Sequence, residues 1–254
     1  MEAAGFFGKL PSERDFVFRD LPAQLTEAWS ARIAAWMQAG RQASGELTWK
    51  QYFLGSPVWR FVLPEGMPET GGAPLAGVMA GSMDGAGRLF PFTVLIVWTA
   101  SSGQMPRLDW LDQILDTVEP RMLAYLDGQG EQEALVQAVF RAGQALQQQS
   151  TDTAPLPNLL CSGEQAALLL HGAPPWRGDL APRILARVDR GEDRNSADAC
   201  ETLWWHDGLG ETLEPQCLAV RGLPAVASAA PLFCPILTSD WQERQADPGA
   251  FDDR

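Results

Sequence analysis

Four residues of this chain carry side chains that could perform hydrolysis: Ser82, Asp84, Arg88 and His206. A nucleophilic Ser needs a His that is itself oriented by a carboxylate. Ser82 lies in the segment Ala-Gly-Ser-Met-Asp-Gly, where Ala80 and Asp84 occupy the two positions that are Gly in a nucleophile elbow. A hydrolase or phosphatase-like enzyme centred on these four residues is therefore one alternative. The simpler interpretation is a serine at a strand end that hydrogen-bonds to the local backbone.

Charged residues also stand beside Gly, Pro and aromatic residues at the ends of expected strands. With Ser82, they form a set of candidate residues: Arg14, Asp15, Trp59, Arg60, Ser82, Asp84 and Arg88. Asp and Arg at strand ends often form bidentate pairs that hold loops together, which is the structural interpretation. The functional interpretation is a partner-binding surface in which Trp and Arg are the anchors.

The sequence offers no pattern for a phosphate loop, a metal or a cofactor. Residues 5–16, GFFGKLPSERDF, come closest to a phosphate loop, but Pro11 removes an N–H group that a phosphate cradle needs. Only two histidines are present, and the spacing of Cys200 and His206 matches no known ligand set. No catalytic, metal or cofactor-binding residue is predicted, and the four cysteines are expected to be buried free thiols.

Hydrophobic periodicity predicts how the chain is organised. Apolar residues at spacings of three and four predict a helix that has Asp20 as its N-cap and ends before Gly40. Further helices are expected over 107–127, where Pro120 predicts a kink or break, 131–149 and 159–170. Extended segments are expected over 49–54, 58–63, 75–83, 88–98, 202–206 and 216–221. Strands interleaved with helices and joined partly by short turns predict a layered α/β domain with a mixed sheet.

Composition narrows the classes of function. The chain has 254 residues and a formal net charge of −13, so binding to nucleic acid or to anionic membranes is disfavoured. No secretory signal is apparent, and the longest apolar run is too short to cross a bilayer, so a cytoplasmic location without membrane insertion is expected. Residues 1–240 are expected to form one domain, followed by an acidic, disordered tail over 241–254.

Several segments together resemble the TagF (ImpM) family of bacterial type VI secretion accessory proteins. They are GFFGKLPSERDFVFRDLP, SPVWRFVLPEG, GSMDGAGRLFPFTVL, LWWHDG and RGLP. The family pattern Ser-x-Asp-x-x-Gly-Arg-x-Phe-Pro is matched fully from Ser82 to Pro91. The sequence departs from the family at Arg14, where relatives usually carry Gly before the Asp. In the opening segment, Phe6, Phe7 and Phe16 are expected to anchor the core.

The resemblance implies a three-layer α/β/α sandwich without known catalysis. It also implies a post-translational negative regulator that acts through protein–protein interaction with type VI secretion regulatory proteins, including a scaffold protein with a forkhead-associated domain. Two alternatives remain at this point: the hydrolase or phosphatase-like enzyme described above, and a structural component of the secretion apparatus.

Overall fold

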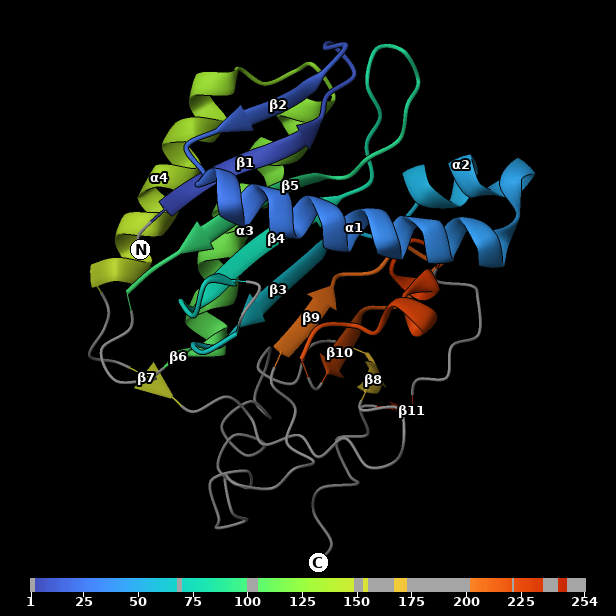
Figure 1. The fold of residues 1–254 in the computed structure, drawn as a ribbon. Helices are drawn as coiled ribbons and strands as arrows, with labels where there is room; N and C mark the ends of the chain where they lie inside the picture. Colours follow the sequence, from blue (N-terminus) through green and yellow to red (C-terminus); the bar gives the residue numbers. More distant parts are fainter. Residues whose placement is uncertain are drawn as a thin grey trace, which may run out of the picture.

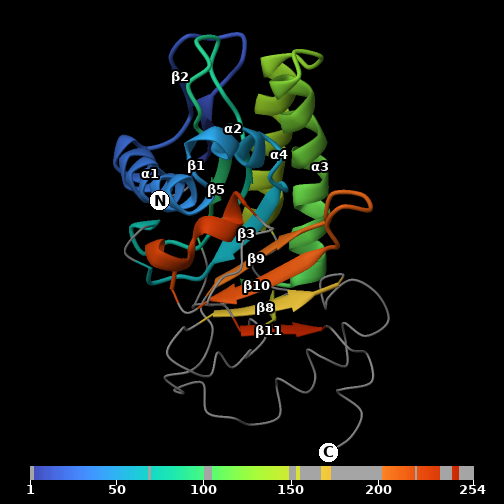
Figure 2. The same ribbon diagram turned by 90° about the vertical axis from the view of Figure 1, so that its right-hand side faces the viewer.

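The chain forms a large sheet that has helices against both of its faces (Figure 1, Figure 2). The computed structural model describes residues 3–67, 70–99, 105–148, 153–154, 167–172, 202–220, 222–234 and 242–245. The strands are β1 (Ala3–Lys9), β2 (Phe16–Arg19), β3 (Trp59–Leu63), β4 (Leu75–Ala80), β5 (Phe92–Val97), β6 (Met105–Pro106), β7 (Thr153–Ala154), β8 (Ala167–His171), β9 (Thr202–His206), β10 (Gln216–Val220) and β11 (Gln242–Gln245). The helices are α1 (Ala23–Ser44), α2 (Glu46–Leu54), α3 (Leu108–Leu126), α4 (Gln132–Gln148) and the short 3₁₀ helices Val226–Ser228 and Ala230–Leu232.

The sheet is mixed, with nine strands in the order β11-β8-β10-β9-β3-β4-β5-β1-β2 among the described residues. Every pair in it is antiparallel except β8 with β11. Because β1 and β4 both pair antiparallel with β5, and β4 and β9 both with β3, the C-terminal ends of β1, β4 and β9 lie at one end of the sheet. The candidate residues at strand ends are gathered at that end.

Alternation along the strands creates two hydrophobic cores. Phe6 and Trp205 lie in the core between the sheet and helices α3 and α4. Phe7 and Trp204, the adjacent residues along the same two strands, lie in the second core, against α1 and α2. Phe61, which pairs with Trp204, also lies in this second core. This is the consequence of a side-chain period of two in strands that are covered on both faces.

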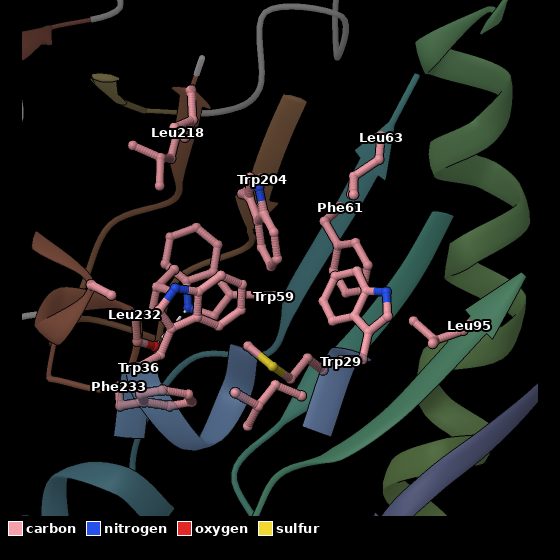
Figure 3. Packing of buried hydrophobic residues seen from close by; sticks show 14 of the residues in the cluster. Trp29, Trp36, Trp59, Phe61, Leu63, Leu95, Trp204, Leu218, Leu232 and Phe233 are labelled. Atoms are coloured by element: carbon pink, nitrogen blue, oxygen red, sulfur yellow. Dashed lines mark hydrogen bonds between the residues drawn. The ribbon is translucent and has the colours of Figure 1, made fainter. Parts of the chain in front are cut away.

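Tryptophans fill the centre of the core under α1 (Figure 3). The Phe61 and Trp204 rings stack with their centroids 4.5 Å apart. The indole N–H of Trp36 donates to the carbonyl of Pro224 at 2.8 Å. Trp36 thus bonds its N–H to the segment that follows β10, and this segment helps to close the core.

Helices α1 and α2 differ from their predicted forms. Helix α1 begins after its N-cap residue Pro22, and Asp20, the predicted N-cap, lies two residues earlier with a left-handed φ of 53°. It also continues past Gly40, where a Cβ atom would lie 2.7 Å from the Trp49 ring. Residues 49–54, predicted to be extended, belong to α2: Trp49 and Phe53 are four apart and both buried, which is a helical period.

Both ends of the sheet also differ from the predictions. Residues 3–9 and 16–19 form β1 and β2, neither of which was predicted, and residues 242–245 form β11 where a disordered tail was expected. The predicted helix 159–170 ends in strand β8, and its residues 159–166 lie outside the described part of the chain. Helix α3 continues through Pro120 without a break.

The predicted core anchors are confirmed in part. Phe6 and Phe7 are fully buried, but Phe16 is 38% exposed because it lies on the edge strand β2. Cys217 and Cys234 are buried free thiols, as predicted. The other two cysteines lie outside the described residues.

Candidate functional site: two buried ionic clusters

Asp84 is the centre of one ionic cluster at the end of the sheet. Its Oδ2 atom accepts hydrogen bonds from Lys9 Nζ at 2.8 Å and from Arg88 Nε at 2.7 Å. Its Oδ1 atom accepts from the backbone N–H groups of Ala86 at 3.0 Å and Arg88 at 2.9 Å. We call Lys9, Asp84 and Arg88 the Asp84 cluster. It joins the last residue of β1 to the turn between β4 and β5.

The charged state of Asp84 is favoured by these donors. Burial of the side chain raises the pKa of Asp84. The hydrogen bonds from Lys9, Arg88 and Ala86 lower this pKa by a larger amount, so the net pKa lies far below its ordinary value. The carboxylate is therefore ionised throughout the physiological range.

The turn that carries Asp84 also holds the loop between β1 and β2. The Gly85 N–H donates to the carbonyl of Glu13 at 2.6 Å, and an Arg88 guanidinium N–H donates to the carbonyl of Arg14. The same guanidinium lies 3.6 Å from the Asp15 carboxylate, which is 96% exposed. Segments about 70 residues apart in the sequence are thus joined, and the motif residues meet as a group.

We expect Asp84→Asn to release the loop between β1 and β2. An amide cannot match the charge of two cations, so the turn and the loop would separate more often. Hydrogen exchange at the Gly85 amide, which is bonded to Glu13, is expected to become about 10-fold faster or more. Asp109→Asn, which removes an exposed pair with Arg107, is the matched control and should leave Gly85 unchanged. Equal exchange at Gly85 in the Asp84 variant and the wild type would contradict this role.

Arg60 is the centre of the second ionic cluster, on the α3 side of the sheet. Its Nη1 atom lies 2.7 Å from Asp112, its Nη2 atom 2.7 Å from Asp116 and 3.4 Å from Asp207, and its Nε atom 2.7 Å from Glu119. The Arg60 side chain is 5% exposed, so one buried cation faces four carboxylates. We call these five residues the Arg60 cluster. It fixes α3 and the end of β9 to β3.

Burial and charge act against each other in this cluster. Burial lowers the pKa of Arg60, but Glu119 and Asp112 raise it above its ordinary value. Burial raises the pKa of Glu119, which the nearby Arg60 cation offsets only in part. Asp112 also accepts a hydrogen bond from Trp205 Nε1 at 2.8 Å, so its carboxylate is bound to both β3 and β9.

The seven candidate residues divide by exposure. Trp59 is 1% exposed, and its indole N–H donates to the carbonyl of Leu232 at 2.8 Å. Trp59 and Arg60 therefore face the interior of the protein. Ser82 and Asp84 are also buried. The side chains that face solvent are those of Arg14, Asp15 and Arg88.

Ser82 and His206 make their hydrogen bonds to other residues. The Ser82 hydroxyl donates to the carbonyl of Lys9 at 2.8 Å, on the β1 side of the sheet. His206 Nδ1 accepts from the Gly208 N–H at 2.9 Å, and Nε2 lies 3.1 Å from Gln216 Oε1. Burial lowers the pKa of His206 to about 4, below the range that suits a general base near neutrality. The described residues thus do not bring Ser82 and His206 together as a catalytic pair.

Sequence reasoning missed the carboxylates of α3. Asp112, Asp116 and Glu119 are spaced by four and three residues, so they share one helical face. Asp112 also interrupts an apolar stripe, and a buried acid at such a position signals a partner cation. Within the described residues, no group of three or more His, Cys, Asp or Glu side chains is arranged to hold a metal ion. None of the described helices is long and apolar enough to span a membrane.

Fold and clusters together define a mixed α/β protein in which charged motif residues hold its own loops and helices in place. A family model described as "TagF N-terminal domain, Type VI secretion system-associated" matches residues 5–142, and the chain belongs to this family. Both motif segments of the Asp84 cluster lie within that range. The chain is therefore a type VI secretion-associated protein.

A solved structure resembles nearly the whole chain. The crystal structure of PA0076 from Pseudomonas aeruginosa PAO1 is 28% identical in sequence and has a TM-score of 0.61. The match covers 92% of this chain and 96% of PA0076. No curated protein matches the chain.

Proposed function

We propose that this protein is a post-translational negative regulator of type VI secretion that acts in the cytoplasm by protein–protein interaction. The expected partner is a scaffold protein with a forkhead-associated domain, and the expected action is to hold that scaffold away from the assembling apparatus. Family membership over residues 5–142 is the observation that carries this proposal. The proposal includes a three-layer α/β/α sandwich, formed as one domain over residues 1–240.

Several features of the site support a binding role without catalysis. Ser82 and His206 are hydrogen-bonded elsewhere, and the Asp84 and Arg60 clusters direct their charges at other parts of the chain. What the motifs present to solvent is a short exposed surface formed by Arg14, Asp15 and Arg88. We propose this surface as the contact for the regulatory partner.

Deletion of the gene is expected to raise effector secretion several-fold in a strain whose type VI system is intact. Overproduction of the protein is expected to suppress secretion. The measurement is the amount of effector in culture supernatants, with a cytoplasmic protein as the lysis control. Unchanged secretion after deletion would refute the regulatory role, and loss of secretion would favour a structural component of the apparatus.

The proposed contact surface can be separated from folding. Arg14 and Asp15 contribute exposed side chains, whereas the loop is held through backbone carbonyls, so Arg14→Ala with Asp15→Ala should leave the loop in place. This double variant is expected to lose capture of the scaffold protein and to fail to restore repression. The matched control is Arg41→Ala with Glu46→Ala, which removes two exposed residues of opposite charge on α1 and α2. Equal scaffold capture by both variants would show that the partner binds elsewhere.

A further inference from the structure

Strand β2 is an edge strand with an unusual exposed face. It pairs with β1 on one side and has no described strand on the other, at the end of the sheet opposite β11 (Figure 2). Phe18 is 59% exposed and Phe16 is 38% exposed, and their rings stack with centroids 5.8 Å apart. An edge strand that presents apolar side chains is a template for pairing with another strand.

The backbone of β2 has hydrogen-bonding groups directed away from β1. A Cβ atom at Gly5 of β1 would collide with the carbonyl oxygen of Arg19, so this carbonyl points toward β1. Backbone groups of successive residues in a strand point to opposite sides. The N–H and C=O groups of Phe16 and Phe18 therefore point outward, where a further strand would pair.

The sequence of this edge is complementary to itself when it is read in the opposite direction. Residues 14–20 read Arg-Asp-Phe-Val-Phe-Arg-Asp, and Val17 is the central residue. An antiparallel pair centred on Val17 places Phe16 opposite Phe18 and Asp15 opposite Arg19 of the second strand. Arg14 and Asp20, which lie just outside β2, are also of opposite charge.

We propose that β2 is a dimerisation edge, at which two copies of this chain pair antiparallel about a two-fold axis at Val17. The backbone geometry agrees with this register, because Val17 directs its groups to β1 and would form the non-hydrogen-bonded pair on the axis. Phe16 and the second copy's Phe18 then form a hydrogen-bonded pair, and symmetry repeats it. Such an isologous contact needs the same patch on both copies, which a self-complementary strand supplies.

Side chains on the two faces of the joined strands match as well. Phe16 and Phe18 lie on the face of β2 that Phe7 shares, so four phenylalanine rings would form one cluster across the junction. On the opposite face, each Asp15 would meet the other copy's Arg19. In the single chain these charges form exposed pairs, Asp15 with Arg88 at 3.6 Å and Arg19 with Asp20 at 3.3 Å. Replacing such exposed pairs with pairs between the two copies costs little free energy.

Overall charge opposes the dimer, while the edge itself is neutral. Each copy carries a net charge of −13, but residues 14–20 contain two Arg and two Asp. Salt screens the long-range repulsion between the copies, so dimerisation should strengthen from low to moderate ionic strength. The contact is short, so we expect a weak dimer with a Kd on the order of 10–100 µM.

Charge-swap variants test the register directly, with sedimentation equilibrium as the measurement. Asp15→Arg places Arg opposite Arg at both symmetric contacts, and Arg19→Asp places Asp opposite Asp. Each single variant is expected to weaken dimerisation by about 10-fold or more. An equimolar mixture of the two is expected to form a heterodimer near wild-type affinity, because every contact is again of opposite charge. The restored heterodimer also shows that both variants are folded.

Three outcomes would overturn the proposal. One is a wild-type protein that stays monomeric up to about 500 µM, well above the expected Kd. That result would leave β2 free to pair with a strand of another protein. Another is dimerisation that neither single variant weakens, which would place the interface elsewhere. The third is a mixture that stays monomeric. The assay uses purified protein alone, so its result is independent of the proposed regulatory function.

Discussion

Replacing Arg60 with Met is expected to lower the free energy of unfolding by about 3–5 kcal/mol at pH 7. Methionine keeps the volume and the apolar stem of the side chain but removes the cation that faces these four carboxylates. Asp112 would remain buried without the Arg60 charge, and like charges on α3 and β9 would face one another. Removing one member of a buried ionic group costs far more than the group contributes in net stability.

Urea unfolding measures this effect without screening the charges. The matched control is Arg41→Met, which removes an exposed ion pair with Glu46 and is expected to change the midpoint little. The destabilisation by Arg60→Met should shrink as the pH falls toward 4, because Glu119, whose pKa is raised by burial, can then take up a proton in the folded state. A loss no greater than that of the control, or one independent of pH, would show that the Arg60 cluster does not hold α3 to the sheet.

Elements with a long hydrophobic periodicity could be predicted from the sequence, whereas some short elements could not. Long helices such as α3 and α4 have several turns of apolar residues, so their existence and faces were predictable. Helix α2 has only nine residues, and two aromatic residues four apart also fit an extended segment. Strand β1 was missed because Gly5 and Gly8 indicate a turn, whereas a Cβ atom at Gly8 would lie 2.4 Å from the carbonyl oxygen of Pro91. The glycines are needed there for close approach of neighbouring backbone.

The candidate site was predictable as a set of residues but not as a set of contacts. Asp84 and Arg88 are four residues apart, and their pairing follows from local geometry. Lys9 is 75 residues from Asp84, and Asp112 is 52 residues from Arg60, so those pairings follow only from the order of the strands. Local sequence cannot supply that order, although a buried acid on the apolar face of α3 does indicate that a cation lies opposite.

Acidification is expected to destabilise the protein through His206. Its Nδ1 atom accepts a hydrogen bond from the Gly208 N–H, so a proton at Nδ1 would place two donors face to face. The ring is also 1% exposed and lies against the Trp59 ring with centroids 4.5 Å apart. Burial lowers the pKa of His206 to about 4, whereas an unfolded histidine has a pKa near 6.5. Above pH 6.5 both states are neutral, and between these two values only the unfolded chain binds the proton.

The free energy of unfolding should therefore fall as the pH drops below 6.5, and His206 alone should account for about 3 kcal/mol by pH 4. Other groups titrate in the same range, including Glu119, whose raised pKa acts in the opposite direction. Comparison with His206→Gln, which cannot titrate, isolates the histidine. Urea unfolding of both proteins at pH 7 and pH 4 should show the wild type losing about 3 kcal/mol more than the variant. Parallel losses would mean that His206 is protonated in the folded state, and its hydrogen bond from Gly208 would then have to break.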